Sequence, residues 1–186
     1  ILTCAGENIM SLVSNLFLLF VAAAVIVYYL VPARWQWLLL LSFSYIYYIA
    51  GGIKYVGFLL FSTLVTWMIA LLIEKEETAG KHKRARKFVI LGLILNFGML
   101  GLIKYTNFAV ENLNALFHMN LRGMEILLPL GISFYTFQSS GYILDVYWKR
   151  CKAEHNPLKY ALFVSFFPQI LQGPIGRYSR LAHQLY

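Results

Sequence analysis

The sequence predicts an all-α protein, a polytopic bundle of transmembrane helices with a broken or re-entrant helix near the C-terminus. Of its 186 residues, 60% are hydrophobic and 13% are charged, whereas a soluble globular domain has ~25% charged residues. One core of this size could not bury so much apolar surface. Several uncharged runs approach the ~20 residues that a helix needs to cross a bilayer. The aromatic content of 17% excludes a disordered chain.

Three apolar runs at the start of the chain predict the first three membrane spans, at residues 12–31, 35–53 and 55–73. A Pro-Ala-Arg sequence separates the first two, and Lys54 separates the second from the third. Residues 1–9 are compatible with an upstream extension before a start at Met10, and the sequence leaves this open.

The next segment, residues 74–87, is hydrophilic and is expected to be a solvated loop. The net charge of the chain is +8, and six basic residues gather in this segment: Lys75, Lys81, Lys83, Arg84, Arg86 and Lys87. Basic residues beside membrane spans favour the cytoplasmic side, which places this loop in the cytoplasm of a multi-pass plasma-membrane protein with its N-terminus outside. No nucleic-acid motif accompanies the charge, so the expected partner is the lipid bilayer and not a nucleic acid.

A fourth span is predicted at residues 88–103, with Gly98 and Gly101 as sites of close helix packing. After Lys104 the pattern changes to that of a separate amphipathic helix, which Arg122 and Gly123 end.

The last two spans, at residues 126–144 and 158–176, are less apolar than the others. Pro168, Gly173 and Pro174 should break the second of them, because proline removes a backbone donor and clashes within a helix. Asp145 follows the first of them and is expected to pair with Lys149 at the helix end, in preference to a role as a catalytic acid.

Five residues of these two spans are candidates for substrate binding. They are Gln138, Gln169, Gln172, Gly173 and Pro174. Polar groups and broken backbone persist in a bilayer where protein or a wet cavity satisfies them, so these residues could line a polar cavity. The other interpretation is that the amides hold helices together. No metal site or disulfide scaffold is predicted, because Cys4 and Cys151 are the only cysteines.

Two motifs make the chain resemble a known family. One is Leu-Pro-Leu-Gly-Ile-Ser-Phe-Tyr-Thr-Phe-Gln at 128–138, which runs on to Tyr-Ile-Leu-Asp-Val-Tyr at 142–147. The other is Phe-Phe-Pro-Gln-Ile-Leu-Gln-Gly-Pro-Ile-Gly-Arg-Tyr at 166–178. Both resemble the membrane-bound O-acyltransferase (MBOAT) family, in its bacterial branch of alginate O-acetylase and teichoic-acid D-alanyl transfer. The likeness covers residues 10–186, including the weaker segments 14–20 and 38–48.

The resemblance implies a membrane enzyme that moves an acyl group, such as acetyl, from a thioester donor to hydroxyls of a cell-envelope polysaccharide. The donor would be acetyl-coenzyme A or an acyl-carrier, with no bound cofactor, and accessory acetylation proteins are further expected partners. The basic segment 74–87 could attract the phosphates of coenzyme A or an acidic carrier protein, although a topological anchor is the simpler interpretation.

The family's catalytic histidine follows a tryptophan, and none of His82, His118, His155 and His183 does so. No catalytic residue is therefore assigned here. The sequence is interpreted as the N-terminal portion of such an enzyme, without the catalytic segment and inactive alone. Two other classes stay open: a membrane transporter or flippase, although no internal repeat is visible, and a non-catalytic membrane scaffold.

Overall fold

The structure is a computed structural model that describes residues 15–117, 131–172 and 176–185. Within these ranges all regular structure is helical, which confirms the all-α prediction. The helices are α1 (Asn15–Leu30), α2 (Ala33–Gly51), α3 (Ile53–Thr78), α4 (His82–Phe117), α5 (Ile132–Tyr147), α6 (Pro157–Ser165), α7 (Phe167–Gln172) and α8 (Tyr178–Leu185).

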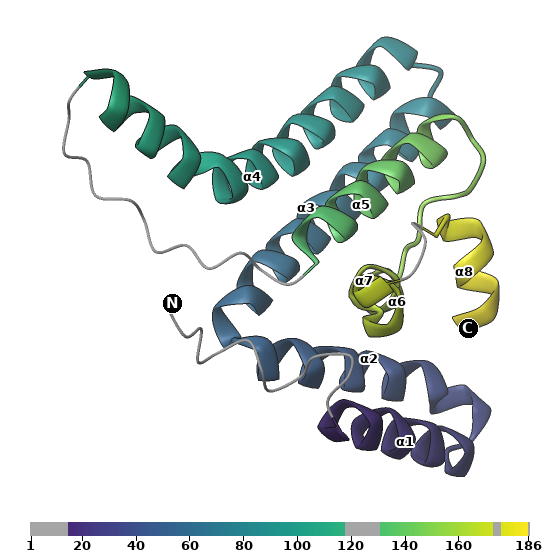
Figure 1. The fold of residues 1–186 in the computed structure, drawn as a ribbon. Coiled ribbons are helices and arrows are strands. Elements are labelled where there is room, and N and C mark those ends of the chain that lie inside the picture. Colours follow the sequence, from purple (N-terminus) through teal and green to yellow (C-terminus); the bar gives the residue numbers. More distant parts are fainter. Residues whose placement is uncertain (1–14, 118–130, 173–175, 186) are drawn as a thin grey trace.

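The centre of the molecule is formed by α3, the first half of α4 and α5, which lie side by side (Figure 1). α6 packs between α5 and α2, while α1 and α2 form a helical hairpin at one end. The largest core cluster includes Tyr142, Tyr160 and Phe163, all of which are almost fully buried. The helices that contribute to this cluster, α2 to α6 and α8, come from both halves of the sequence.

Two helical stretches, Val56–Thr78 of α3 and His82–Thr106 of α4, are long and apolar enough to cross a membrane. α1 is a shorter apolar helix of 16 residues. The third and fourth predicted spans fall on these two stretches. Membrane crossing by the other four predicted spans stays a prediction.

The expectation of a loop over residues 74–87 is wrong in extent. α3 continues to Thr78 and α4 begins at His82, so only residues 79–81 form a turn. Gly80 adopts a left-handed conformation with φ 71°, and the amide of Lys81 donates to the carbonyl of Glu76, as in a Schellman helix end. The prediction was wrong because it took the many charged residues as a sign of a loop. Glu, Lys, Arg and Ala are all good helix formers.

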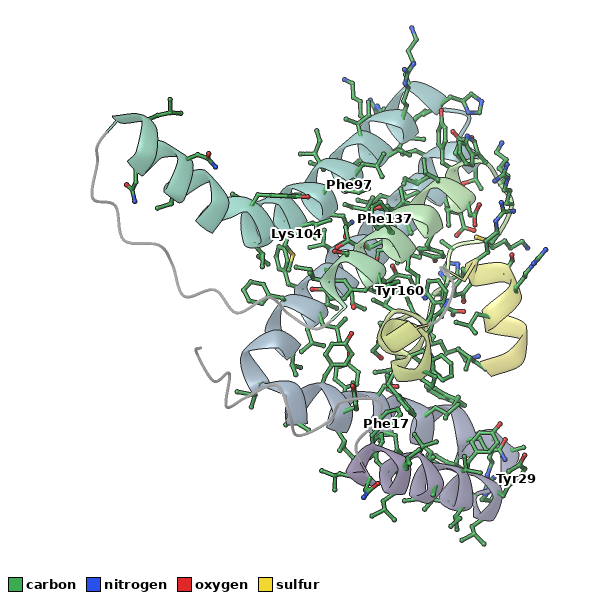
Figure 2. All side chains as sticks on the ribbon, viewed as in Figure 1. Phe17, Tyr29, Phe97, Lys104, Phe137 and Tyr160 are labelled. Carbon is green, nitrogen blue, oxygen red and sulfur yellow. The ribbon has the colours of Figure 1, made fainter. Side chains whose placement is uncertain are left out.

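The expected separate amphipathic helix after Lys104 is also wrong, since α4 is one helix of 36 residues. It changes direction close to Lys104, and its last turns project away from the core (Figures 1 and 2). Thr106 Oγ1 donates to the carbonyl of Leu102, an arrangement that often bends helices. Among the residues that the structure describes, none would contact a Cβ at Gly98 or Gly101, so the expected close packing at these glycines is not seen there.

The broken helix near the C-terminus is confirmed. α6 ends at Ser165, Phe166 has a non-helical ψ of 103°, and α7 begins at Phe167. Pro168 therefore lies in the first turn of α7, where proline is tolerated. If α6 continued unbroken to this position, the proline ring would clash with the carbonyl of Val164. The first residues of the predicted span 126–144, up to 130, lie outside the described residues.

Candidate functional site

The inner face of α5 is rich in buried polar groups. Ten of its 16 residues are buried, and five of these ten are polar or charged: Thr136, Gln138, Ser139, Ser140 and Asp145. The exposed positions include Phe134 and Phe137. The polar residues therefore face other helices, as expected for groups that hydrocarbon cannot solvate.

Gln138 connects α5 to the break between α6 and α7. Its Nε2 donates to the carbonyl of Phe163 at 2.9 Å and to Oε1 of Gln169 at 3.3 Å. In an unbroken helix the carbonyl of Phe163 would accept from the amide of Phe167, but that amide donates to Ser44 Oγ of α2 at 3.4 Å. The side chain of Gln138 thus replaces the donor that the helix break removes.

Gln169 lies against the chain that leads into α8. A Cβ at Gly176 would come within 2.2 Å of the Gln169 Nε2 atom, so a larger residue at 176 would displace the Gln169 amide from this position. The structure therefore brings Gln138 and Gln169 together, as the interpretation of both motifs as one site predicts. Gln172 belongs to α7 by its backbone, and Gly173 and Pro174 lie outside the described residues.

A cavity of about 240 Å³ lies beside this amide pair, between α5 and the start of α8. Gln138 lines it together with nine other residues: Gly141, Tyr142, Leu144, Asp145, Trp148, Arg150, Gly176, Arg177 and Tyr178. The two arginines were not predicted as site residues. The signal for them was present, because Arg177 belongs to the second motif and Arg150 closely follows the first.

The walls of this cavity are held by aromatic packing and by Glu154. The ring of Tyr142 lies 4.7 Å from that of Tyr160 and 4.9 Å from that of Tyr178, measured between centroids. Tyr178 donates to Glu154 Oε2 at 2.6 Å, and the amide of Glu154 donates to the Tyr142 hydroxyl at 2.7 Å. The start of α8 is thereby fixed against α5.

A second polar network, which the sequence analysis missed, joins α3 to α4. Asn96 Oδ1 accepts from Ser62 Oγ at 3.0 Å, and Asn96 Nδ2 donates to Thr66 Oγ1 at 3.0 Å. Thr66 also contacts the hydroxyl of Tyr160, which donates to Ser139 at 3.5 Å. An asparagine inside an apolar span was the available signal.

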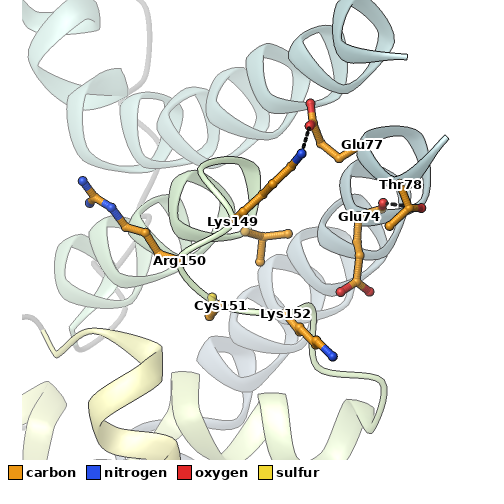
Figure 3. Close-up of a pocket in the computed structure, with 8 residues that line it drawn as sticks. Glu74, Glu77, Thr78, Lys149, Arg150, Cys151 and Lys152 are labelled. Carbon is orange, nitrogen blue, oxygen red and sulfur yellow. Dashed lines mark hydrogen bonds and ion pairs between the residues drawn. The ribbon is translucent and has the colours of Figure 1, made fainter. Parts of the chain in front are cut away.

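A second cavity, of about 460 Å³, lies at the end of the bundle where α3 and α5 finish (Figure 3). Glu77 is buried there and accepts from His82 Nδ1 at 2.8 Å and from Lys149 Nζ at 3.3 Å. The hydrogen bond from His82 and the ammonium of Lys149 hold the pKa of Glu77 below its usual value, against the effect of burial. Both basic segments of the chain, 74–87 and 149–152, thus meet at this end.

The ion pair expected between Asp145 and Lys149 does not form, because Lys149 contacts Glu77 instead. Arg150 Nη1 lies 3.5 Å from Asp145 Oδ1 and takes its place. Figure 3 shows the two consecutive side chains extending in different directions. A nucleophilic role for Cys151 is disfavoured, since burial and the carboxylates of Asp145 and Glu74 raise its pKa to about 12.

Two of the four histidines contact glutamates outside the apolar interior. His82 contacts Glu77, and His155 Nε2 lies 3.4 Å from Glu74 Oε2. Their side chains are 64% and 79% exposed. Neither is placed as a membrane-buried base. His118 lies outside the described residues.

The curated proteins that this chain resembles include O-acetylases and an O-acetyltransferase. The chain is 39% identical, over 92% of its length, to a probable alginate O-acetylase of Azotobacter vinelandii. It is 38% identical over 92% to the corresponding protein of Pseudomonas aeruginosa, and 33% identical over 80% to a peptidoglycan O-acetyltransferase of Helicobacter pylori. These relatives bear out the resemblance to the membrane-bound O-acyltransferase family.

The chain spans about a third of the length of these relatives, between 32% and 35%. No protein-family model matches it, and no solved structure is detectably similar to it. The likeness to this family therefore rests on the two motifs and on the curated relatives, which agree with each other.

Proposed function

We propose that this protein takes part in the transfer of an acetyl group from a thioester donor to hydroxyls of a cell-envelope polysaccharide. The observation that carries the proposal is 38–39% identity over 92% of the chain to proteins named probable alginate O-acetylases. The buried polar face of α5, beside the cavity at Gln138, supports it. The transporter and scaffold alternatives have no comparable support.

In this reaction the hydroxyl oxygen of the acceptor attacks the thioester carbonyl. A carbon–oxygen bond forms, the carbon–sulfur bond breaks, a base takes the hydroxyl proton, and the leaving thiolate gains a proton. The substrate-binding residues in this proposal are Gln138, Gln169, Gln172, Gly173 and Pro174. Gln138 acts mainly by position, because its amide nitrogen already donates to Phe163 and Gln169.

The general base in this proposal is a histidine in a part of the protein other than these 186 residues. His82 and His155 face Glu77 and Glu74 at the end of the bundle, remote from hydrocarbon. A histidine suits the role because its pKa of ~6.5 lies near the working pH. The chain by itself is proposed to be inactive.

In the proposed topology the protein crosses the plasma membrane several times, with its N-terminus outside and residues 74–87 cytoplasmic. The proximity of Lys149 to Glu77 supports one common side for the two basic segments. The donor, acetyl-coenzyme A or an acyl-carrier, would reach this side, and the polysaccharide the other. Accessory acetylation proteins are further proposed partners.

The acceptor named for the relatives differs, alginate for two of them and peptidoglycan for the third. Deleting the gene in its native cells and measuring ester-linked acetate separately in secreted polysaccharide and in peptidoglycan tests the proposal. We expect acetate to be lost from one of the two fractions and restored by the wild-type gene. Unchanged acetate in both would contradict the proposal.

A matched pair of variants tests the site in the same cells. Gln138→Leu should restore much less acetate than the wild type. Gln36→Leu removes a glutamine of α2 whose amide donates to the carbonyls of Tyr28 and Val31 and which does not line the cavity, and should restore acetate fully.

A further inference from the structure

The cavity between α5 and α8 has two guanidinium groups in its wall, from residues 27 positions apart in sequence. Arg150 comes from the turn after α5, and Arg177 immediately precedes α8. Asp145 is the one carboxylate among the residues that line it, so the charged side chains sum to +1. Guanidinium groups present a planar fork of donors that matches phosphate oxygens.

Arg150 is held in position by three contacts. Asp145 Oδ1 lies 3.5 Å from its Nη1, and its guanidinium carbon lies 4.7 Å from the centre of the Trp148 ring, within the range of a cation–π contact. Its backbone amide donates to the carbonyl of Asp145 at 2.8 Å. An arginine that is already ordered loses less entropy when it binds a ligand.

The turn that carries Arg150 is strained at its preceding residue. Lys149 has φ 57°, a left-handed conformation that is unfavourable for a non-glycine residue. With the hydrogen bonds from Lys149 to Val146 and from Arg150 to Asp145 it forms a Schellman helix end. With this turn, the side chain of Lys149 reaches Glu77, and Arg150 lines the cavity between α5 and α8.

Arg177 is placed by its two neighbours. Gly176 lies against the amide of Gln169, which a Cβ at this position would displace. Tyr178 is buried and donates to Glu154. The backbone of Arg177 is therefore fixed on both sides, while its side chain stays exposed at the cavity.

The size and position of the cavity restrict the ligand. Its volume of about 240 Å³ is below the roughly 300–1,000 Å³ of a pocket that encloses a whole drug-sized ligand. It therefore suits one end group of a larger molecule. Arg150 lies at the end of the bundle that also carries both basic segments, the end predicted to face the cytoplasm, where soluble phosphate esters are available.

We propose that this cavity binds a phosphate ester of the acyl donor, with Arg150 and Arg177 as its phosphate-binding residues. Identifying the ligand as the acyl donor rests on the proposed function, whereas the binding of a phosphate ester does not. Gln138, at the wall of the same cavity, connects the bound donor to the helix break at Phe166.

Calorimetric titration of the protein in nanodiscs of zwitterionic lipid tests this proposal. The probes are coenzyme A, 4′-phosphopantetheine and pantetheine, which differ in their phosphate groups, and an oligouronate as a phosphate-free anion. We expect coenzyme A and 4′-phosphopantetheine to bind at least about tenfold more tightly than pantetheine, as hydrogen bonds to charged groups predict. Equal affinity for pantetheine, or tighter binding of the oligouronate, would overturn the proposal.

Three variants test whether coenzyme A binds at the cavity between α5 and α8. Arg150→Gln and Arg177→Gln should each weaken coenzyme A binding about tenfold and leave pantetheine unchanged. Arg180→Gln removes an exposed arginine of α8 that does not line the cavity, and should change affinity less than twofold. An equal loss in Arg180→Gln would show diffuse attraction and contradict the assignment.

Thermal unfolding of each variant separates loss of binding from loss of fold. Arg177→Gln is the decisive variant, because its midpoint should match that of the wild type. If Arg177→Gln unfolds at the wild-type temperature and still binds coenzyme A normally, the proposal is wrong. Unchanged cellular acetate after deletion of the gene, with coenzyme A binding intact, would instead contradict only the proposed function.

Discussion

α1 and α5 have the same length, 16 residues, and opposite relations between composition and burial. α1 is almost entirely apolar, yet only Phe17 and Ala24 are buried in it. α5 contains glutamine, serine, threonine and aspartate, and ten of its residues are buried. In a soluble protein the more apolar helix would occupy the core.

This inverse relation between apolar composition and burial is the one expected when lipid, and not water, surrounds the helices. Apolar side chains gain little by leaving lipid for a protein interior, whereas a polar group facing lipid has no partner. Helices with polar faces therefore turn inward, and apolar helices are left at the periphery. Figure 2 shows Tyr29 at the outer end of α1 and Tyr160 in the centre of the molecule.

The largest expected difference between the two regions comes from two tyrosines. Tyr160→Ala should lower the free energy of unfolding by about 3 kcal/mol or more, because it empties a fully buried site that contacts Tyr142 and Phe163. Tyr29→Ala removes a side chain that is 79% exposed, and should change it by less than about 0.5 kcal/mol. Denaturant titration in detergent measures both. Similar losses in the two variants would contradict the comparison.

A smaller effect is expected from the glutamine that bridges to the helix break. Gln138→Leu should cost about 1–2 kcal/mol, because the carbonyl of Phe163 loses its donor in a buried site. Gln36→Leu, at the partly exposed turn between α1 and α2, should cost less than half as much in the same titration. An equal cost would mean that the helix break does not depend on Gln138.

Two glycines of α4 sharpen the comparison further, with effects of opposite sign. A Cβ at Gly92 would lie 2.7 Å from Ile143 Cδ1 and 3.1 Å from Ile69 Cγ2, so Gly92→Ala should destabilise by about 1 kcal/mol. Gly98 has open space, so Gly98→Ala should stabilise by up to about 1 kcal/mol through helix propensity. Unfolding midpoints of the two variants should therefore shift in opposite directions. Shifts in the same direction would refute the packing of α4 on α3 and α5.

The smallest effect concerns pH at the end of α3. The folded state lowers the pKa of Glu77 from its ordinary value of 4.5, so its stabilising effect is complete above that value and is lost as the pH falls through the folded pKa. Glu77→Gln should therefore reduce stability at pH 7 and weaken the acid-dependent loss below pH 4.5. The unfolding midpoint between pH 3 and pH 7 measures this. An unchanged acid dependence would show that other carboxylates cause it.

The sequence predicted the helical class and the helix break because both have local causes. Pro168 ends α6 whatever surrounds it, and apolar runs of sufficient length must be helical in a membrane. The union of Gln138 and Gln169 could be inferred from two polar segments in otherwise apolar surroundings. That Arg150 and Arg177 line the same cavity could not be inferred from the sequence, because it depends on the turn at Lys149 and on the packing of Tyr178.

Two local expectations failed where tertiary contacts or propensity outweighed charge patterns. The charged stretch after Ile73 is helical up to Thr78, because its residues favour helix and Glu77 is buried beside Lys149. Gly98 and Gly101 were expected to pack closely against neighbouring helices. The glycine of α4 that lies close to Ile69 and Ile143 is Gly92, on a different face of the helix. Which glycine faces a neighbour depends on the rotation of α4, which spacing alone does not determine.

The central claim is that the polar face of α5 is turned away from lipid while α1 faces it. Photolabelling of the wild-type protein in bilayers with a lipid-soluble carbene precursor, mapped by mass spectrometry, tests this without substitutions. We predict strong labelling of α1 at Leu18, Leu19 and Ile26, and labelling of α5 confined to its exposed positions Phe134 and Phe137. Labelling of Gln138, Ser139 or Ile143 at the level of α1 would contradict the account.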